Sequence, residues 1–248
     1  MANWSDPRPG AAPFATATAA RSDVYDAGLR SYMLSVYNYM TSGVLLTGIV
    51  AMLFAWGGVN SPAAQVMLSG GPLAWIIMLA PLGFVFAMSF GQGRMRTSTL
   101  QMMFWGFSVV MGLSLSTIFL AYSSTAIATS FFGTAAAFAG LSLYGYTTKR
   151  NLSAMGTFLL MGLIGLIVAM VINIFVHSSA LAMVISLVGV LLFAGLTAYD
   201  TQRTKSLYAH VAGTDMMGRV VIMSALSLYL DFINMFLFIL RLQGGGRN

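Results

Sequence analysis

Long apolar runs alternate with short polar breaks from residue 32 to residue 242. No Asp, Glu, Lys or Arg occurs between Thr97 and Thr148, and none occurs between Asn151 and Tyr199. Each stretch is long enough for two membrane-spanning helices, since a helix needs about 20 apolar residues to cross a bilayer. Strands of a membrane barrel would alternate apolar and polar residues, so the continuous runs predict helices.

Short polar turns divide the runs into seven expected spans. Tyr122-Ser123-Ser124 breaks the first long stretch, and His177-Ser178-Ser179 breaks the second. The expected spans cover residues 32–56, 73–91, 99–121, 125–146, 155–177, 180–202 and 220–242. We therefore predict an all-α membrane protein, folded as a seven-transmembrane-helix bundle.

The division into spans also predicts three parts of the chain. Residues 1–31 hold Pro, Gly, Ala and mixed charges without an apolar run, so we expect a cytoplasmic, disordered tail. They lack the apolar core of a cleaved signal peptide, so the first span is expected to remain as an anchor. Residues 32–242 are the expected transmembrane domain, and residues 243–248 are a short C-terminal tail.

Composition supports a surface that faces lipid. The chain of 248 residues is 58% hydrophobic and 7% charged, whereas soluble domains carry about 25% charged residues. It has no cysteine, which excludes disulfides, zinc thiolate sites and thiol catalysis. Its net charge of +6 comes from basic residues between apolar runs, a pattern that indicates membrane orientation rather than binding to nucleic acid.

The basic residues predict how the bundle is oriented. Ten of the 12 Lys and Arg residues precede the first span or lie between spans 2 and 3, 4 and 5, or 6 and 7. Basic loops stay in the cytoplasm, so we expect a cytoplasmic N-terminus and, after seven spans, an external C-terminus. Arg241 and Arg247 depart from this rule, and a re-entrant last segment is the alternative.

Small residues recur in the fourth expected span. Gly133 and Ala137 form one small-xxx-small pair, and Ala136 and Gly140 form another. Such pairs let helices approach closely in membranes. We therefore predict that this side of the span packs against another helix.

One aspartate lies in the middle of span 7. Asp231 shares a helix face with Ser224, Ser227 and Asn234, which are spaced by three or four residues. A charged Asp at mid-bilayer costs roughly 2.5–3.5 kcal/mol and usually faces a bundle interior or a wet cavity. The stripe predicts an interior helix that lines a polar path. The alternative is a buried Asp that only fixes helix packing.

A second aspartate, Asp200, lies near the end of span 6 on one face with Thr197. The helix macrodipole disfavours an anion at a helix C-terminus, which suggests that a nearby cation or a shared proton stabilises Asp200. The alternative is that Asp200 only marks the membrane interface. If Asp200 and Asp231 meet in a low dielectric, they cannot both ionise cheaply, and the pair would titrate as a unit. Deprotonated, the two carboxylates and nearby hydroxyls could bind Ca²⁺.

A difference in depth opposes this pairing. Asp231 lies about 16 Å from the expected start of span 7, at a rise of 1.5 Å per residue, whereas Asp200 lies at the very end of span 6. Contact requires span 6 to continue past Asp200, or span 7 to start later.

Two segments resemble the signature of the Bax inhibitor family, also called the transmembrane Bax inhibitor motif family. They are Phe193-Ala-Gly-Leu-Thr-Ala-Tyr-Asp-Thr-Gln202 and Ala225-Leu-Ser-Leu-Tyr-Leu-Asp-Phe-Ile-Asn-Met-Phe-Leu-Phe-Ile-Leu-Arg241. Three further stretches are similar to its bacterial branch: Thr99–Trp105, Ser142–Lys149 and Met161–Gly165. The resemblance covers roughly residues 30–243.

The resemblance implies a bundle with the last helix central, in a bacterial inner membrane. It implies a pH-sensitive Ca²⁺ leak with the aspartate pair as sensor, and a basic latch near the end of span 2 that maps onto Arg94 or Arg96. Ca²⁺ would be a permeant or weakly bound ion, and no cofactor is expected.

Two other functions are alternatives to the leak. A non-catalytic modulator of a membrane protease, or of stress response, would act through contacts of residues 1–30. An intramembrane aspartyl protease also uses two aspartates, and Tyr199-Asp200 fits its first motif. Its second motif, Gly-x-Gly-Asp, does not occur at Asp231, which follows Leu228-Tyr229-Leu230. We therefore expect no enzymatic activity.

Overall fold

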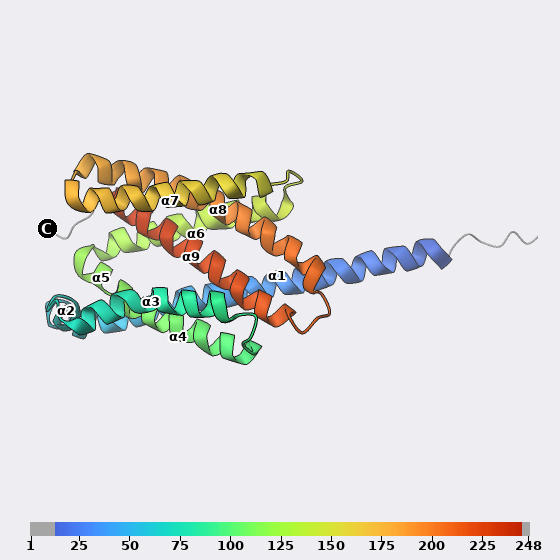
Figure 1. Cartoon of the computed structure of the whole chain (residues 1–248), viewed down its shortest axis with the longest axis horizontal. Helices are drawn as coiled ribbons and strands as arrows, with labels where there is room; N and C mark the ends of the chain where they lie inside the picture. The colour runs from blue at the N-terminus through green and yellow to red at the C-terminus, as the bar shows by residue number, and fades with distance from the viewer. Residues whose placement is uncertain (1–12, 245–248) are drawn as a thin grey trace, which may run out of the picture.

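The computed structural model describes residues 13–244, with side chains from residue 24 onwards. Every regular element in this part of the chain is a helix, and Figure 1 shows the long helices lying side by side. The elements are α1 (Pro13–Phe54), η1 (Gly58–Asn60), α2 (Pro62–Met67), α3 (Pro72–Gly91), α4 (Thr97–Leu115), α5 (Thr117–Ala121), α6 (Ser124–Thr147), α7 (Ser153–Val176), α8 (Ser179–Val211) and α9 (Met217–Gln243).

Seven helical segments among the described residues are long and apolar enough to cross a bilayer, which confirms the predicted fold class. The chain is a multi-pass membrane protein. Both predicted turns fall where helices meet, because Ser123 caps α6 and Ser178 caps α8. Each serine hydroxyl accepts a hydrogen bond from the backbone N–H three residues on, as expected of an N-cap.

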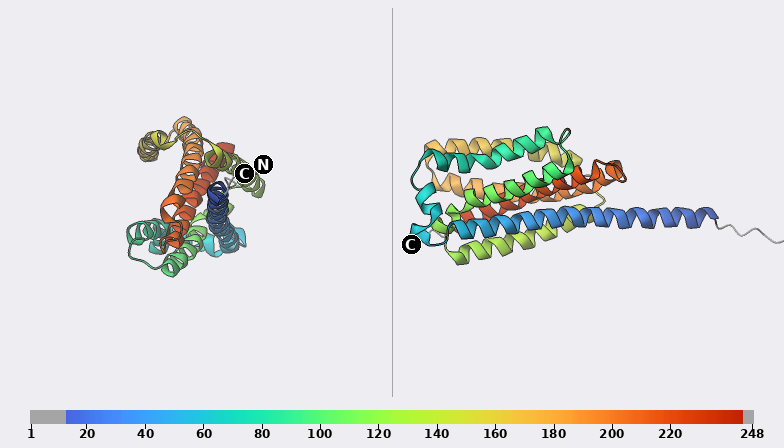
Figure 2. Two further views of the ribbon diagram at one scale, coloured as in Figure 1. Left: turned by 90° about the vertical axis from the view of Figure 1, so that its right-hand side faces the viewer. Right: turned by 90° about the horizontal axis from the view of Figure 1, so that it is seen from below.

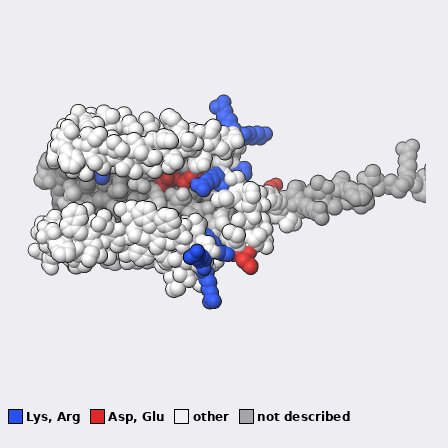
Figure 3. Space-filling model, viewed as in Figure 1, with Lys and Arg blue, Asp and Glu red and all other residues white. Residues whose placement is uncertain are grey.

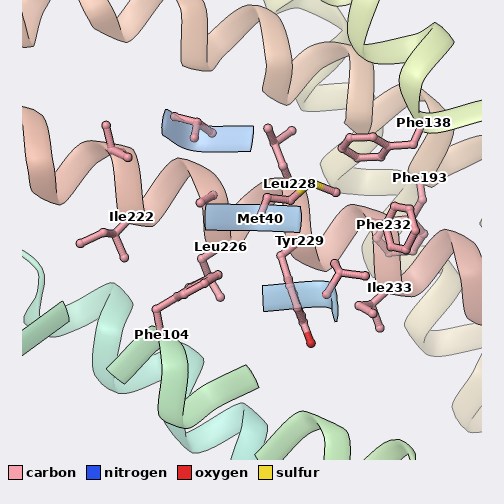
Figure 4. Packing of buried hydrophobic residues seen from close by; sticks show 14 of the residues in the cluster. Met40, Phe104, Phe138, Phe193, Ile222, Leu226, Leu228, Tyr229, Phe232 and Ile233 are labelled. Carbon is pink, nitrogen blue, oxygen red and sulfur yellow. The ribbon is translucent and has the colours of Figure 1, made fainter. Parts of the chain in front are cut away.

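The last helix, α9, runs through the middle of the bundle, as predicted. Its apolar window is 67% buried, against at most 33% in any other span. It packs against α1, α4, α6 and α8, and the end-on view in Figure 2 shows the bundle gathered around it. Its side chains pack in different directions: the Phe232 ring lies 5.6 Å from that of Phe138 in α6, and the Tyr229 ring lies 6.2 Å from that of Phe104 in α4, centroid to centroid (Figure 4).

The first helix is longer than the first predicted span. Residues 13–31, expected to belong to a disordered tail, are the start of α1, which projects beyond the other helices in Figure 1. This segment contains five alanines and no proline after Pro13. Alanine is the strongest helix former, which explains why the helix extends so far. Residues 1–12 of the expected tail lie outside the described residues.

The sixth spanning helix, α8, continues to Val211, so the prediction that it ends near residue 202 is wrong. The segment after Asp200 is polar enough to resemble a loop, but Thr204, Tyr208 and Val211 recur at helical spacing and are buried. The Tyr208 ring lies 5.3 Å from that of Tyr32 in α1, centroid to centroid. Packing against α1 therefore supports the last three turns of α8.

The small residues of α6 predicted to pack against another helix do not do so within the described part of this chain. All four are exposed: Gly133, Ala136, Ala137 and Gly140. A Cβ atom added at Gly133 or Gly140 would meet no atom within 4 Å. The close approach of α6 occurs at Gly145 instead, where an added Cβ would overlap the backbone carbonyl of Ala198 in α8. Residue spacing alone does not say which side of a helix faces its neighbours.

Basic side chains gather at one end of the bundle, called here the basic end. It is formed by the turns that follow α3, α6 and α8, and most of the Lys and Arg visible in Figure 3 lie there. The arrangement agrees with the alternation of basic and uncharged loops along the sequence.

Candidate functional site

Asp200 of α8 and Asp231 of α9 line one cavity of about 430 Å³ between α7, α8 and α9. The expected difference in depth disappears because α8 continues past Asp200 as far as Val211. Asp200 is 9% exposed and Asp231 is 5% exposed. In Figure 3, acidic atoms lie in a groove between two uncharged ridges. The structure therefore brings the two residues to a shared site.

The two carboxyl groups differ in their hydrogen bonds. The Ser227 hydroxyl of α9 donates to Asp200 Oδ2 at 2.7 Å and so links the two helices. Asp231 Oδ2 is buried, and no donor among the described residues reaches it. A buried acceptor without a donor is unfavourable by about 1–3 kcal/mol, and more if it is charged. Of the two aspartates, Asp231 is therefore the one with a buried carboxyl oxygen that no donor in the described part of the chain stabilises.

Only some of the other residues predicted to support the aspartates line the cavity. Asn234 lines the cavity, and its Nδ2 donates to the Leu230 carbonyl at 2.8 Å. Within the described part of the chain, neither Ser224 nor Thr197 lines it. The Thr197 hydroxyl donates to the Phe193 carbonyl one turn earlier in α8, at 2.8 Å. Of the predicted stripe on α9, Ser227, Asp231 and Asn234 thus line the cavity.

The site has few ligands for a metal ion. Among the described residues, no group of three or more His, Asp or Glu side chains could hold a metal. Ca²⁺ usually takes about six to eight oxygen ligands, whereas this cavity offers two carboxyl groups, the Ser227 hydroxyl and the Asn234 amide. Such a donor set suits brief contact with a partly hydrated ion better than permanent binding.

The predicted latch residues lie elsewhere. Arg94 and Arg96 are exposed in the turn between α3 and α4, and in the part of the chain described here neither lines the aspartate cavity. That turn is held by Arg219 of α9, whose Nη1 donates to the Gly93 carbonyl at 3.2 Å. The structure therefore gives neither arginine a contact with Asp200.

A third charged residue on the cavity was not predicted. Arg241 lines it from the far end of α9, with Cζ 5.6 Å from the centroid of the Phe238 ring. Its place on the stripe was available from the sequence, because it follows Asn234 by seven residues and therefore shares its face. By charge alone, Arg241 stands out only as an exception to the positive-inside rule.

The opposite side of α9 is fixed by a buried hydrogen-bonded chain. Thr47 Oγ1 of α1 donates to the Ser108 carbonyl of α4 at 2.8 Å. The Tyr229 hydroxyl lies 2.7 Å from the same Thr47 oxygen. Since Thr47 has only one proton to give, Tyr229 is the donor in that second bond. The chain joins α1, α4 and α9, and so sets the rotation of α9 that turns Asp231 toward the cavity.

The similarity to known proteins extends over nearly the whole chain. The model of a family described as "Inhibitor of apoptosis-promoting Bax1" matches residues 29–248, which include both aspartates. An uncharacterised protein of Rickettsia prowazekii is 45% identical over 232 residues, 93% of this chain and 96% of that protein. The inner membrane protein YbhL of Escherichia coli is 41% identical over 224 residues, 89% of this chain and 94% of that protein.

Proposed function

Because this chain belongs to the Bax inhibitor family of membrane proteins, we propose that it is a pH-sensitive Ca²⁺ leak in which ions and protons meet at Asp200 and Asp231. One observation carries this proposal. The two aspartates share a cavity, and one carboxyl oxygen of Asp231 has no donor among the described residues. A proton or a passing cation would satisfy that oxygen.

The apolar walls of the cavity strengthen the electrostatic interactions of the two aspartates. Leu163 and Leu166 of α7 line the cavity together with the aspartates, and electrostatic interactions strengthen where apolar side chains replace water. Carboxylates are hard oxygen ligands, which Ca²⁺ prefers. An incomplete set of protein ligands leaves room for water on the ion, so Ca²⁺ can be attracted without being trapped.

Protons and Ca²⁺ would compete for the same oxygens. A metal ion binds the deprotonated ligand, and its binding therefore releases protons. A higher Ca²⁺ concentration should then move the midpoint of the flux-against-pH curve toward lower pH. Competition of this kind is the proposed basis of the pH sensitivity.

The proposed location is the bacterial inner membrane, in keeping with the name of the Escherichia coli relative. We place the basic end in the cytoplasm, because Lys and Arg remain on that side during insertion. With seven spans, the N-terminus would then be cytoplasmic and the C-terminus external.

The test is Ca²⁺ flux into liposomes that contain the purified full chain and a Ca²⁺ dye, measured over a range of pH. Asp200→Asn and Asp231→Asn keep the size of the side chain and remove its titration, so both should lose the pH dependence. Asp215→Asn is the matched control, since Asp215 is exposed between α8 and α9 and should leave the profile unchanged.

Two results would contradict the proposal. One is a pH profile that is the same in wild type and in both cavity variants. The other is absence of flux from the wild-type chain at every pH, which would favour the non-catalytic role at a membrane protease and make capture of that protease by the N-terminal segment the next experiment.

A further inference from the structure

A second, larger hollow lies on the other side of α9 from the aspartates, between α1 and α6. It consists of two adjoining cavities of about 760 Å³ and 460 Å³. They share Val44, Phe131 and Phe232, so they form one continuous groove. Phe232 of α9 forms its floor, and α1 and α6 form its walls. Apart from Arg30, the residues that line it are uncharged.

The larger cavity has the depth of one bilayer leaflet. It extends along α1 from Arg30 to Leu45, which is about 22 Å at 1.5 Å per residue. A bilayer with its headgroups is about 40–45 Å thick, so one leaflet is about half of that. With Arg30 at the headgroup level, the cavity would reach the middle of the membrane near Val44.

Positive charge lies at the headgroup level of this groove. Arg30 of α1 lines its mouth, and Tyr146 of α6 lies on the other wall. Lys205 of α8 sits beside Tyr146: its Nζ lies 4.8 Å from the ring centroid and donates to the Tyr146 carbonyl at 2.8 Å. Asp26, near Lys205, is the opposing charge. Lys149 follows α6 at the same end, so basic residues outnumber Asp26 at this end of the groove, although Arg30 alone of them lines it.

We propose that this groove binds a single phospholipid with an anionic headgroup. One acyl chain would lie between α1 and α6 on the Phe232 floor, with the headgroup at Arg30, the charged residue that lines the mouth; Lys205 lies in the adjoining pocket on the other side of Tyr146. A transmembrane helix of another protein would fill the apolar walls but would leave the basic mouth without a matching charge. The lipid satisfies both parts of the groove. This site is separate from the aspartate cavity, and the inference does not depend on Ca²⁺ transport.

The test compares two lipids by native mass spectrometry of the full chain in detergent. Phosphatidylglycerol and phosphatidylcholine with identical acyl chains differ only in the headgroup, and we expect the anionic lipid to bind more tightly. Arg30→Gln should reduce that preference about fivefold, the effect of one basic residue at a membrane surface. Asp26→Asn should increase it, because it removes the opposing charge.

Two control variants separate a site from general attraction to a basic surface. Arg94→Gln removes an exposed arginine of the basic end that lines neither part of the groove, and it should leave the preference unchanged. Ala139→Trp places a bulky ring on the α6 wall and should weaken binding of both lipids. Equal binding of the two lipids to wild type, or equal losses in Arg30→Gln and Arg94→Gln, would overturn the proposal.

Discussion

The contact between α6 and α8 at Gly145 allows a quantitative test of the fold around Asp200. Replacing Gly145 by Ala adds one methyl group where the backbone of Ala198 already lies. Backbone atoms cannot rotate away as a side chain can, so the two helices must separate. Ala198 precedes Asp200 by two residues, and the displacement would therefore disturb the bond between Ser227 and Asp200 as well.

The size of the effect follows from the overlap. Inserting a methyl group into a tightly packed contact costs about 1–3 kcal/mol. Gly140→Ala, in the same helix, adds its methyl group to open space, and the helix propensity of alanine should stabilise that variant by up to about 1 kcal/mol. For a chain of this length 1 kcal/mol corresponds to about 2–4 °C in Tm. Both variants gain this propensity, so Gly145→Ala should have a Tm about 2–12 °C below that of Gly140→Ala, which itself should not fall below wild type.

Thermal unfolding of the two purified variants in one detergent measures this difference. The comparison cancels general effects of the detergent, because both substitutions are Gly→Ala in α6. Equal shifts in Tm for the two variants would refute the close approach of α6 and α8 at Gly145.

Two further predictions concern turns. The Gln202 side chain accepts a hydrogen bond from the Leu152 N–H and donates one to the Arg150 carbonyl, each at 2.8 Å. Gln202→Leu removes both bonds, so it should loosen the α6–α7 turn and speed its cleavage by trypsin. Gln65→Leu, in α2, is the control, and equal cleavage rates would count against this role. His177 has a left-handed φ of 52°, so His177→Gly should raise Tm by a few degrees, since glycine adopts this conformation without strain. Ser178→Ala removes the α8 cap and should lower Tm; shifts of the same sign in both variants would contradict the argument.

The spans were predictable from the sequence because each is an uninterrupted apolar run, and the serine turns were predictable because serine caps the next helix. The length of α8 was not predictable by hydropathy. Its last three turns carry charged and polar residues, and they are helical because Tyr208 finds an aromatic partner in α1. A contact between helices so distant in sequence leaves no trace in local composition.

The candidate site was predictable in part. The spacing of Ser227, Asp231 and Asn234 identified one face of α9, and the structure places all three on the cavity. Thr197 shares a face with Asp200 but uses its hydroxyl within its own helix, a bond that is always available to a helical threonine. Residue spacing identifies one face of a helix. It does not show which polar side chains on that face already form hydrogen bonds within their own helix.

The unbroken course of α8 has a mechanical consequence. Asp200 and Val211 belong to one helix without an internal break, separated by about 16 Å. A helix is stiff over that length, so a push or a tilt applied near Val211, outside the apolar region, is transmitted to Asp200 without a hinge to absorb it. A displacement at the end of α8 would therefore reach the Asp200 carboxyl group directly.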